Sequence, residues 1–119
     1  MENKSAKEFL SLVKAFDAHE RPIVAKFGAT WCPPCQEFAP TIKALSEDDS
    51  EFITVSVDID DQRELALHMG VESVPTTFLI YKGLCIDSFE GVASEDDVRL
   101  WVKQEVSRMT VQPLEITDD

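Results

Sequence analysis

The chain has 119 residues, of which 44% are apolar and 8% aromatic, enough to form the core of one compact domain. Its 11 basic and 23 acidic residues give a formal net charge of −12, so nucleic acid is excluded as a partner because a phosphate backbone would repel it. The first residues are polar and no apolar run is long enough to cross a bilayer, so we expect no secretion leader, no membrane association and a cytoplasmic location.

The first half of the chain predicts helices and strands in alternation. Residues 5–19 begin with a capping box and continue with apolar residues at helical spacing, which predicts an amphipathic helix. Residues 23–29 are almost continuously apolar, as is typical of a strand buried on both faces. Residues 32–46 follow as a second helix, which Pro40 is expected to bend, and residues 52–59 form a second strand.

The second half of the chain predicts a short helix, a hairpin and a final helix. The short helix occupies residues 61–70, which end in a glycine. Residues 76–81 and 84–89 are rich in β-forming side chains on either side of a tight turn, which favours an antiparallel hairpin. Residues 94–109 carry one apolar stripe at helical spacing, and residues 110–119 are interpreted as a polar tail.

This order of elements predicts an α/β fold with a central mixed sheet between layers of helices. The sheet has four or five strands, because residues 1–4 contain no β-favouring run that would supply a fifth at the N-terminus. Residues 1–109 are expected to form the single domain. Three cysteines in a reducing compartment suggest one working pair and one bystander, not a disulfide framework.

The pair in Trp31-Cys32-Pro33-Pro34-Cys35 is the clearest chemical feature of the sequence. Two cysteines three positions apart at a helix start are close enough for their sulfurs to join. Cys32 falls at the exposed helix N-terminus, where free amides and the helix dipole favour a thiolate, so it is the predicted nucleophile. Cys35, one turn further in, would attack the mixed disulfide and release the reduced product.

The two prolines between the cysteines are expected to modulate this chemistry. Pro33 and Pro34 have no N–H, so the amide of Cys35 is the first that can donate to the Cys32 sulfur. Their fixed φ also stiffens the loop in both redox states. We therefore hypothesise that Pro33 changes the redox poise relative to a Gly-Pro linker.

Residues 27–35 resemble the active-site segment of the thioredoxin family, and the resemblance extends over roughly residues 5–108. Further matches lie at the helix kink, the strand after it, the cis-proline loop and the turn after the last strand; they are Ala39-Pro40 and residues 57–60, 71–76 and 89–92. The joint order of these features is specific, whereas a lone CxxC would be weak. The resemblance implies a thioredoxin fold, with four helices around the sheet and the cis-proline loop beside the cysteine helix.

The same resemblance implies a substrate groove around the cysteines. Pro75 would be the cis-proline next to the sulfurs, and the backbone of Val74 would pair with an extended substrate segment. Trp31 would shield the disulfide and contact the substrate, with Gly91 and Val92 as the opposite lip. The family binds no cofactor and works through its redox-active disulfide. The implied partners are disulfide-containing proteins and a thioredoxin reductase that supplies electrons from NADPH, and the chain is expected to be a monomer.

The sequence departs from the family beneath the resolving cysteine. The family usually has a buried aspartate where this chain has Lys26, and the lysine that often pairs with that aspartate is replaced by Ser56. Lys26 could accept the Cys35 proton or stabilise its thiolate. The simpler interpretation, which we favour at this stage, is that Lys26 reaches the surface or pairs with an acid such as Asp58.

The CxxC pair and Cys85 each allow another interpretation. A CxxC can be half of a zinc site, but zinc needs about four ligands and the remaining candidates, Cys85, His19 and His68, are far apart in sequence, so no metal is expected. Cys85 lies between Leu84 and Ile86 and is interpreted as a small buried residue, with a surface thiol as the alternative.

The sequence therefore predicts a protein-disulfide reductase. Its Cys-Pro-Pro-Cys linker also resembles tryparedoxins and nucleoredoxins, which share the fold and take electrons from a different donor. A function of another class, a thioredoxin-like module that only holds a partner in the groove, is the remaining alternative.

Overall fold

The computed structural model describes residues 21–48 and 51–116, with side chains through residue 109. The elements in chain order are β1 (Ile23–Gly28), α2 (Pro33–Glu47), β2 (Ile53–Asp58), α3 (Arg63–Met69), β3 (Thr76–Tyr81), β4 (Leu84–Glu90) and α4 (Glu95–Ile116). The helix predicted over residues 5–19 lies outside the described residues. The other predicted helices and strands are all present.

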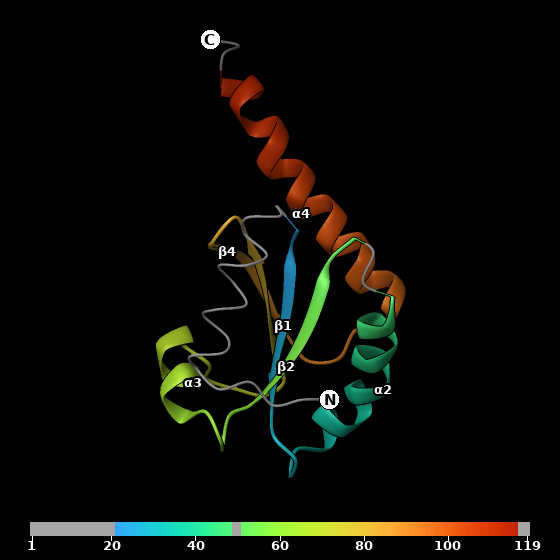
Figure 1. The fold of residues 1–119 in the computed structure, drawn as a ribbon, viewed down its shortest axis with the longest axis vertical. Helices are drawn as coiled ribbons and strands as arrows, with labels where there is room; N and C mark the ends of the chain where they lie inside the picture. The colour runs from blue at the N-terminus through green and yellow to red at the C-terminus, as the bar shows by residue number, and fades with distance from the viewer. Residues whose placement is uncertain (1–20, 49–50, 117–119) are drawn as a thin grey trace.

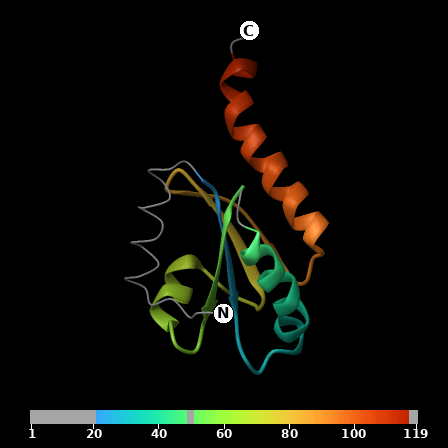
Figure 2. The same ribbon diagram turned by 45° about the vertical axis from the view of Figure 1, so that its right-hand side comes forward.

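The sheet is mixed and, in the described part of the chain, has four strands in the order β2-β1-β3-β4. Strand β1 pairs in parallel with β2 and antiparallel with β3, and β3 pairs antiparallel with β4. Helices α2 and α4 lie on one side of the sheet and α3 on the other (Figures 1 and 2). The predicted α/β architecture is confirmed in its four-stranded form.

Strand β1 is the centre of the fold, and all six of its residues are buried. Because side chains alternate along a strand, Ala25 and Phe27 pack in the cluster under α3, whereas Val24 packs in the cluster under α2 and α4. The same alternation places Lys26 and Gly28 on the α2 side. The strand thus brings a lysine to the helix that carries the cysteines.

Helix α2 buries a stripe formed by Cys35, Phe38, Ile42 and Leu45, spaced so that they share one face. Cys35 is therefore the first core residue of this helix. Pro40 lies inside the helix, which continues beyond it to Glu47.

Helix α4 begins as the sequence predicts, with the Asp97 amide donating to the Ser94 hydroxyl over 3.1 Å. Its backbone remains helical through Ile116, past Met109, where a polar tail was predicted to begin. The last glycine of the sequence is Gly91, so none follows Met109 to end the helix. The domain boundary at residue 109 stays a prediction. Across the described residues no helix combines the length and apolarity of a membrane span.

The interpretation of Cys85 as a buried residue is wrong, because the structure exposes it. Strand β4 is an edge strand, and the adjacent Leu84 is also 59% exposed. The β3–β4 pairing shifts register between Leu79 and Ile80, opposite this segment, so strict alternation of buried and exposed positions fails here.

Candidate active site

Cys32 occupies the N-cap of α2, and its sulfur accepts a hydrogen bond from the Cys35 backbone N–H. The N–Sγ distance is 3.2 Å. Pro33 and Pro34 fill the first two helical positions, so the Cys35 amide is the first that the helix offers, as predicted from the sequence. Both cysteines are free thiols in this structure.

Cys32 is less accessible than its position at a helix terminus predicts, since only 3% of the residue is exposed. The cover comes from the chain before β3. Val74 packs against both cysteines, and the Cys32 thiol donates to the Val74 carbonyl oxygen at 3.6 Å. The Val74 backbone therefore covers the sulfur of Cys32.

The predicted cis-proline loop is confirmed, because the Val74–Pro75 peptide bond is cis. The Gly91 amide donates to the Pro75 carbonyl over 2.9 Å, which joins this loop to the turn after β4. Gly91 has a φ of +93°, a conformation that favours glycine, and the next residue, Val92, is 43% exposed. The structure thus places the turn that carries Gly91 and Val92 against the cis-proline loop, while Trp31, the other predicted lip, lies on the chain before α2.

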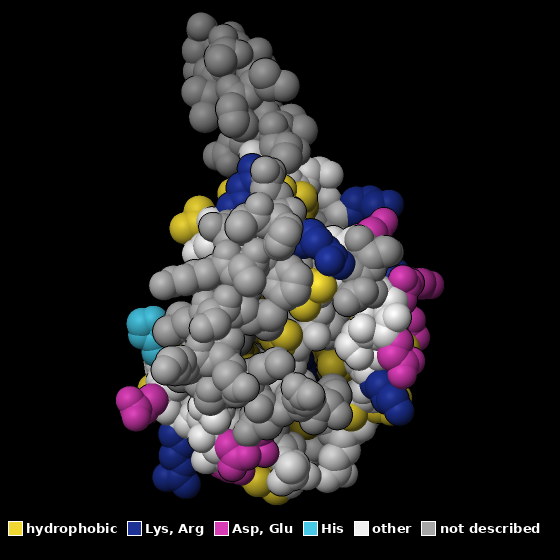
Figure 3. Space-filling model, viewed as in Figure 1, with side chains coloured by type: hydrophobic (Ala, Val, Ile, Leu, Met, Phe, Trp, Pro, Cys, Tyr) yellow, Lys and Arg dark blue, Asp and Glu magenta, His cyan; other side chains and the backbone are white. Residues whose placement is uncertain are grey.

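Trp31 is 62% exposed, and its indole Nε1 donates to the Asp60 carboxylate over 2.7 Å. The Asp60 amide in turn donates to the Asp58 carboxylate over 2.9 Å. Sequence reasoning did not single out Asp60. The signal was available, because the carboxyl ends of parallel strands meet at one sheet edge and Asp60 follows β2 as Trp31 follows β1. Figure 3 shows acidic side chains at this end of the molecule, where β1 leads toward α2.

Cys35 is 2% exposed, and this burial raises the pKa of its thiol. The hydrogen bond with Cys32 raises the pKa further, whereas a backbone hydrogen bond with Ala29 and the positive charge of Lys26 lower it. Burial is the largest of these effects, so the net direction is upward. The resolving cysteine therefore needs help to ionise.

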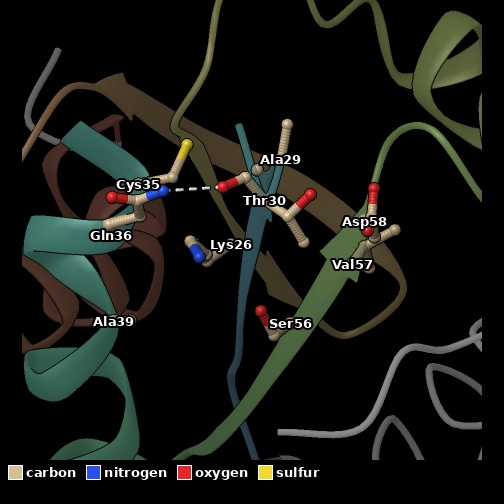
Figure 4. A pocket seen from close by; sticks show the side chains of 10 residues that line it. Lys26, Ala29, Thr30, Cys35, Gln36, Ala39, Ser56, Val57 and Asp58 are labelled. Atoms are coloured by element: carbon tan, nitrogen blue, oxygen red, sulfur yellow. Dashed lines mark hydrogen bonds between the residues drawn. The ribbon is translucent and has the colours of Figure 1, made fainter. Parts of the chain in front are cut away.

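A cavity of about 340 Å³ lies between β1, β2 and the first turns of α2 (Figure 4). Gln36 Nε2 donates to the Thr30 carbonyl over 2.8 Å at its edge, the contact dashed in Figure 4. The cavity is lined by Lys26, Gly28, Ala29, Thr30, Cys35, Gln36, Ala39, Ser56, Val57 and Asp58. It therefore reaches the resolving cysteine, and Val74 is not among the residues that line it.

Lys26 is only 5% exposed, so the expectation that its side chain reaches the surface is wrong. The reason is the position of β1 in the middle of the sheet, under α2. The alternative expectation, an ion pair with Asp58, is also absent, because no described carboxylate lies within ion-pair distance of the lysine nitrogen. In register, Lys26 lies between Ser56 of β2 and Thr77 of β3.

The described residues contain no cluster of three or more histidine, cysteine and acidic side chains that could hold a metal. His68 lies in the last turn of α3. His19 lies outside the described residues.

Comparison with known proteins agrees with this geometry. The family model described as Thioredoxin matches residues 1–104. The chain belongs to the thioredoxin family. Among curated thioredoxin relatives, the mitochondrial thioredoxin of Mus musculus is 35% identical over 86 residues, covering 71% of this chain and 52% of that protein. The thioredoxin of Equus caballus is 37% identical over 78 residues, covering 66% of this chain and 74% of that protein.

Solved thioredoxin structures share the fold. The Fasciola hepatica thioredoxin has a TM-score of 0.76 and 32% identity, covering 85% of this chain and 94% of that one. A Schistosoma mansoni thioredoxin has a TM-score of 0.74 and 33% identity, with 87% and 93% coverage. The chain spans about half the length of the mitochondrial thioredoxins, with 52% of their sequence matched. Thioredoxin family membership supports thiol–disulfide oxidoreduction as the general chemistry of the cysteine pair.

Proposed function

We propose that the protein reduces disulfide bonds in other proteins, with Cys32 as nucleophile and Cys35 as resolving cysteine. The observation that carries this proposal is the 3.2 Å contact between the Cys35 amide and the Cys32 sulfur at a helix N-terminus. A thiolate on Cys32 is stabilised there by a backbone donor and by the helix dipole. The second thiol stands one turn away.

The reaction proceeds in two exchanges. The Cys32 thiolate attacks one sulfur of the substrate disulfide, and the S–S electron pair leaves with the other sulfur, which takes a proton from water. The Cys35 thiolate then attacks Cys32 in the mixed disulfide, and the remaining substrate sulfur leaves with the electron pair and is protonated. The substrate gains two electrons, and the Cys32–Cys35 disulfide that forms has lost them.

The groove beside Cys32 would hold the substrate. The Val74 carbonyl, which accepts the Cys32 thiol in this structure, would accept a backbone N–H of an extended substrate chain instead. Trp31, with 62% of its surface exposed, and Val92, with 43%, would contact substrate side chains on either side. Pro75 and Gly91, already joined by a hydrogen bond, hold the two sides in place.

The electron donor is part of the proposal. A thioredoxin reductase would return the disulfide to the dithiol with electrons from NADPH, and the chain itself would bind no cofactor. The proposed setting is the cytoplasm, with the chain acting as a monomer. The Cys-Pro-Pro-Cys linker also resembles that of tryparedoxins and nucleoredoxins, which take electrons from a different donor. NADPH consumption in the presence of thioredoxin reductase therefore decides between the donors.

Insulin reduction by dithiothreitol tests the activity. Wild-type protein is expected to accelerate insulin precipitation, and Cys32→Ser is expected to abolish the acceleration. Cys35→Ser should accumulate a mixed disulfide with insulin, since nothing resolves it. Cys85→Ser is the matched control, because it removes an exposed thiol outside the site, and it should behave as wild type. A wild-type rate equal to that of Cys32→Ser would overturn the proposal in favour of a binding module.

A further inference from the structure

The most unusual feature of the site is a buried ammonium group that no described carboxylate neutralises. Lys26 is 5% exposed, and it takes part in none of the ion pairs of the described residues. Placing a charge in a poorly solvated position is costly unless an opposite charge compensates it. An anion near Lys26 would therefore be stabilised strongly.

The nearest group that can become an anion is the thiol of Cys35. A Cβ on Gly28 would lie 3.1 Å from Lys26 Nζ and 3.2 Å from Cys35 Sγ. Because Lys26 Nζ and Cys35 Sγ both lie this close to the same Cβ position, the distance between them is at most the sum of the two lengths. At this separation an opposite charge favours ionisation appreciably. Figure 4 shows the Lys26 nitrogen on the α2 side of β1.

None of the other described groups around Lys26 and Cys35 carries a positive charge. Cys32, at the N-cap of α2, is the sulfur that Cys35 must attack. Asp58, from β2, lines the same cavity, and its carboxylate accepts the Asp60 amide in the turn after the strand. The remaining lining residues are neutral, and Thr77 is the β3 residue opposite Lys26. Lys26 is thus the positive charge that faces Cys35.

We propose that Lys26 is the electrostatic partner of the Cys35 thiolate, so that it speeds the resolving exchange near neutral pH and makes the cysteine pair more oxidising at alkaline pH, where Cys35 ionises. The inference rests on the proposed reductase function and adds a determinant of its potential. Lys26 takes no proton and forms no bond in this scheme. It acts through Cys35 as a modulating residue.

The effect on the potential follows from the two redox states. At an alkaline pH that ionises Cys35 in the dithiol form, its thiolate and Lys26 neutralise each other within the core. In the disulfide form both sulfurs are uncharged, and the Lys26 ammonium loses its counter-charge. A dithiol donor that delivers two electrons to the disulfide therefore forms a state that Lys26 stabilises, which favours the reduced form.

The effect on the resolving exchange has the same origin. Lowering the pKa of a thiol that is raised by burial increases its thiolate fraction at neutral pH tenfold per unit. The nucleophilicity of a thiolate falls less steeply than that, with a Brønsted coefficient of about 0.4–0.5. The gain in thiolate outweighs the loss in reactivity, so the exchange becomes faster.

Equilibration with glutathione at alkaline pH, where Cys35 is ionised, tests the potential. Lys26→Met removes the charge in a side chain of similar length, and we expect the disulfide form to be favoured about tenfold more, a potential about 30 mV lower for this two-electron couple. Lys26→Arg keeps the charge and should stay close to wild type. Lys43→Met removes the same charge from an exposed position of α2, the helix that carries Cys35, and should change nothing. A Lys26→Met constant within twofold of wild type overturns the inference.

A titration of Cys35 gives an independent readout. In a Cys32→Ser background, the ¹³Cβ shift of Cys35 is followed against pH, and Lys26→Met should move its midpoint upward, whereas Lys26→Arg should restore it. Lys26→Gln offers the same comparison if the methionine variant does not fold. An unmoved midpoint in a folded variant overturns the inference. Failure of the reductase proposal is a separate outcome, because it appears as inactivity of the wild-type chain toward insulin.

Discussion

Trp31 and Asp60 are joined by a 2.7 Å hydrogen bond from the indole nitrogen to the carboxylate. The bond connects the residue before the proposed nucleophile to the turn after β2, so the exposed ring is held in one orientation at the rim of the groove. A typical intramolecular hydrogen bond contributes only about 0.5–1.5 kcal/mol, so this bond is mainly an orienting contact, not a support of the fold.

Replacing Asp60 with alanine is therefore expected to weaken substrate binding without slowing the chemistry. The KM for a protein disulfide should rise about threefold while kcat stays unchanged, because a freely turning Trp31 must be ordered again by the substrate. Asp60→Asn keeps an acceptor and should recover most of the loss. Asp61→Ala removes the same charge at the neighbouring position. An equal rise in KM for this variant would show that the charge, not the hydrogen bond to Trp31, is responsible.

Adding a methyl group at Gly28 tests the space between the lysine and the sulfur. The new Cβ would lie 3.0 Å from Lys26 Cε, 3.1 Å from its nitrogen and 3.2 Å from Cys35 Sγ. The flexible end of Lys26 should move aside, so Gly28→Ala is expected to lower the potential in the same direction as Lys26→Met and to destabilise the fold by about 1–3 kcal/mol. In a Lys26→Met background the same substitution should shift the potential no further.

The stability of the dithiol form should fall as the pH rises through the ordinary thiol range. Burial raises the pKa of Cys35, so the thiol ionises in the unfolded chain before it does so in the folded one. The unfolded state then holds fewer protons, and the free energy of unfolding decreases by up to about 1.4 kcal/mol per pH unit. Urea titrations between pH 7 and 10 measure it in a Cys85→Ser background.

The disulfide form is the control for that measurement, because its Cys35 cannot ionise. Its unfolding free energy should lack this part of the pH dependence. Equal slopes for the two forms would mean that Cys35 has the same pKa in the folded and unfolded chains, contrary to its burial.

The active-site prolines offer a matched pair of substitutions. An N-cap side chain accepts from the amides at the second and third helical positions, and Pro34 holds the second of these without an N–H. Pro34→Ala supplies the missing donor to the Cys32 sulfur, so we expect a stabilised thiolate and a higher reduction potential. Pro33→Gly adds an amide only at the first position, and its shift should be smaller. A larger shift for Pro33→Gly would mean that loop stiffness, not donor count, sets the poise.

A buried charge that lacks a counter-charge also predicts a stability effect in the oxidised protein. Lys26→Met is expected to raise the free energy of unfolding of the disulfide form by about 1–4 kcal/mol, the range found when buried charged groups are replaced by apolar ones. At alkaline pH the gain in the dithiol form should be smaller, because the methionine variant loses the attraction to the ionised Cys35. Denaturant unfolding of both forms gives the comparison.

Local patterns were sufficient to predict the cysteine pair and the helices and strands that the structure describes, whereas the helix expected over residues 5–19 stays a prediction. The position of Cys32 before two prolines fixes a helix start, and the nearly unbroken apolar run of β1 identifies a strand buried on both faces. The alternation of side chains along β1 also places Lys26 on the side of the sheet that α2 covers, and α2 carries Cys35.

What the sequence could not supply depends on contacts between distant segments. Cys32 is covered by Val74, 42 positions away, and this contact has no local signature. The contact of Trp31 with Asp60, 29 positions away, can be inferred only once β1 and β2 are paired in parallel. The burial of Lys26 was missed because the preference of lysine for solvent is an average over many sites. The central position of β1 under α2 overrides that average here.

The sequence contains two tryptophans, and the structure gives them unlike surroundings. Trp31 stands in solvent next to the reactive sulfurs, whereas Trp101 is half-buried, packs edge-on against Phe89 with ring centroids 4.8 Å apart and donates to the Asp87 carboxylate over 2.7 Å. Their fluorescence should therefore separate, with a longer-wavelength emission that follows the oxidation state and a shorter-wavelength emission that follows unfolding. The protein thus contains its own optical probes for both processes, with no dye to attach.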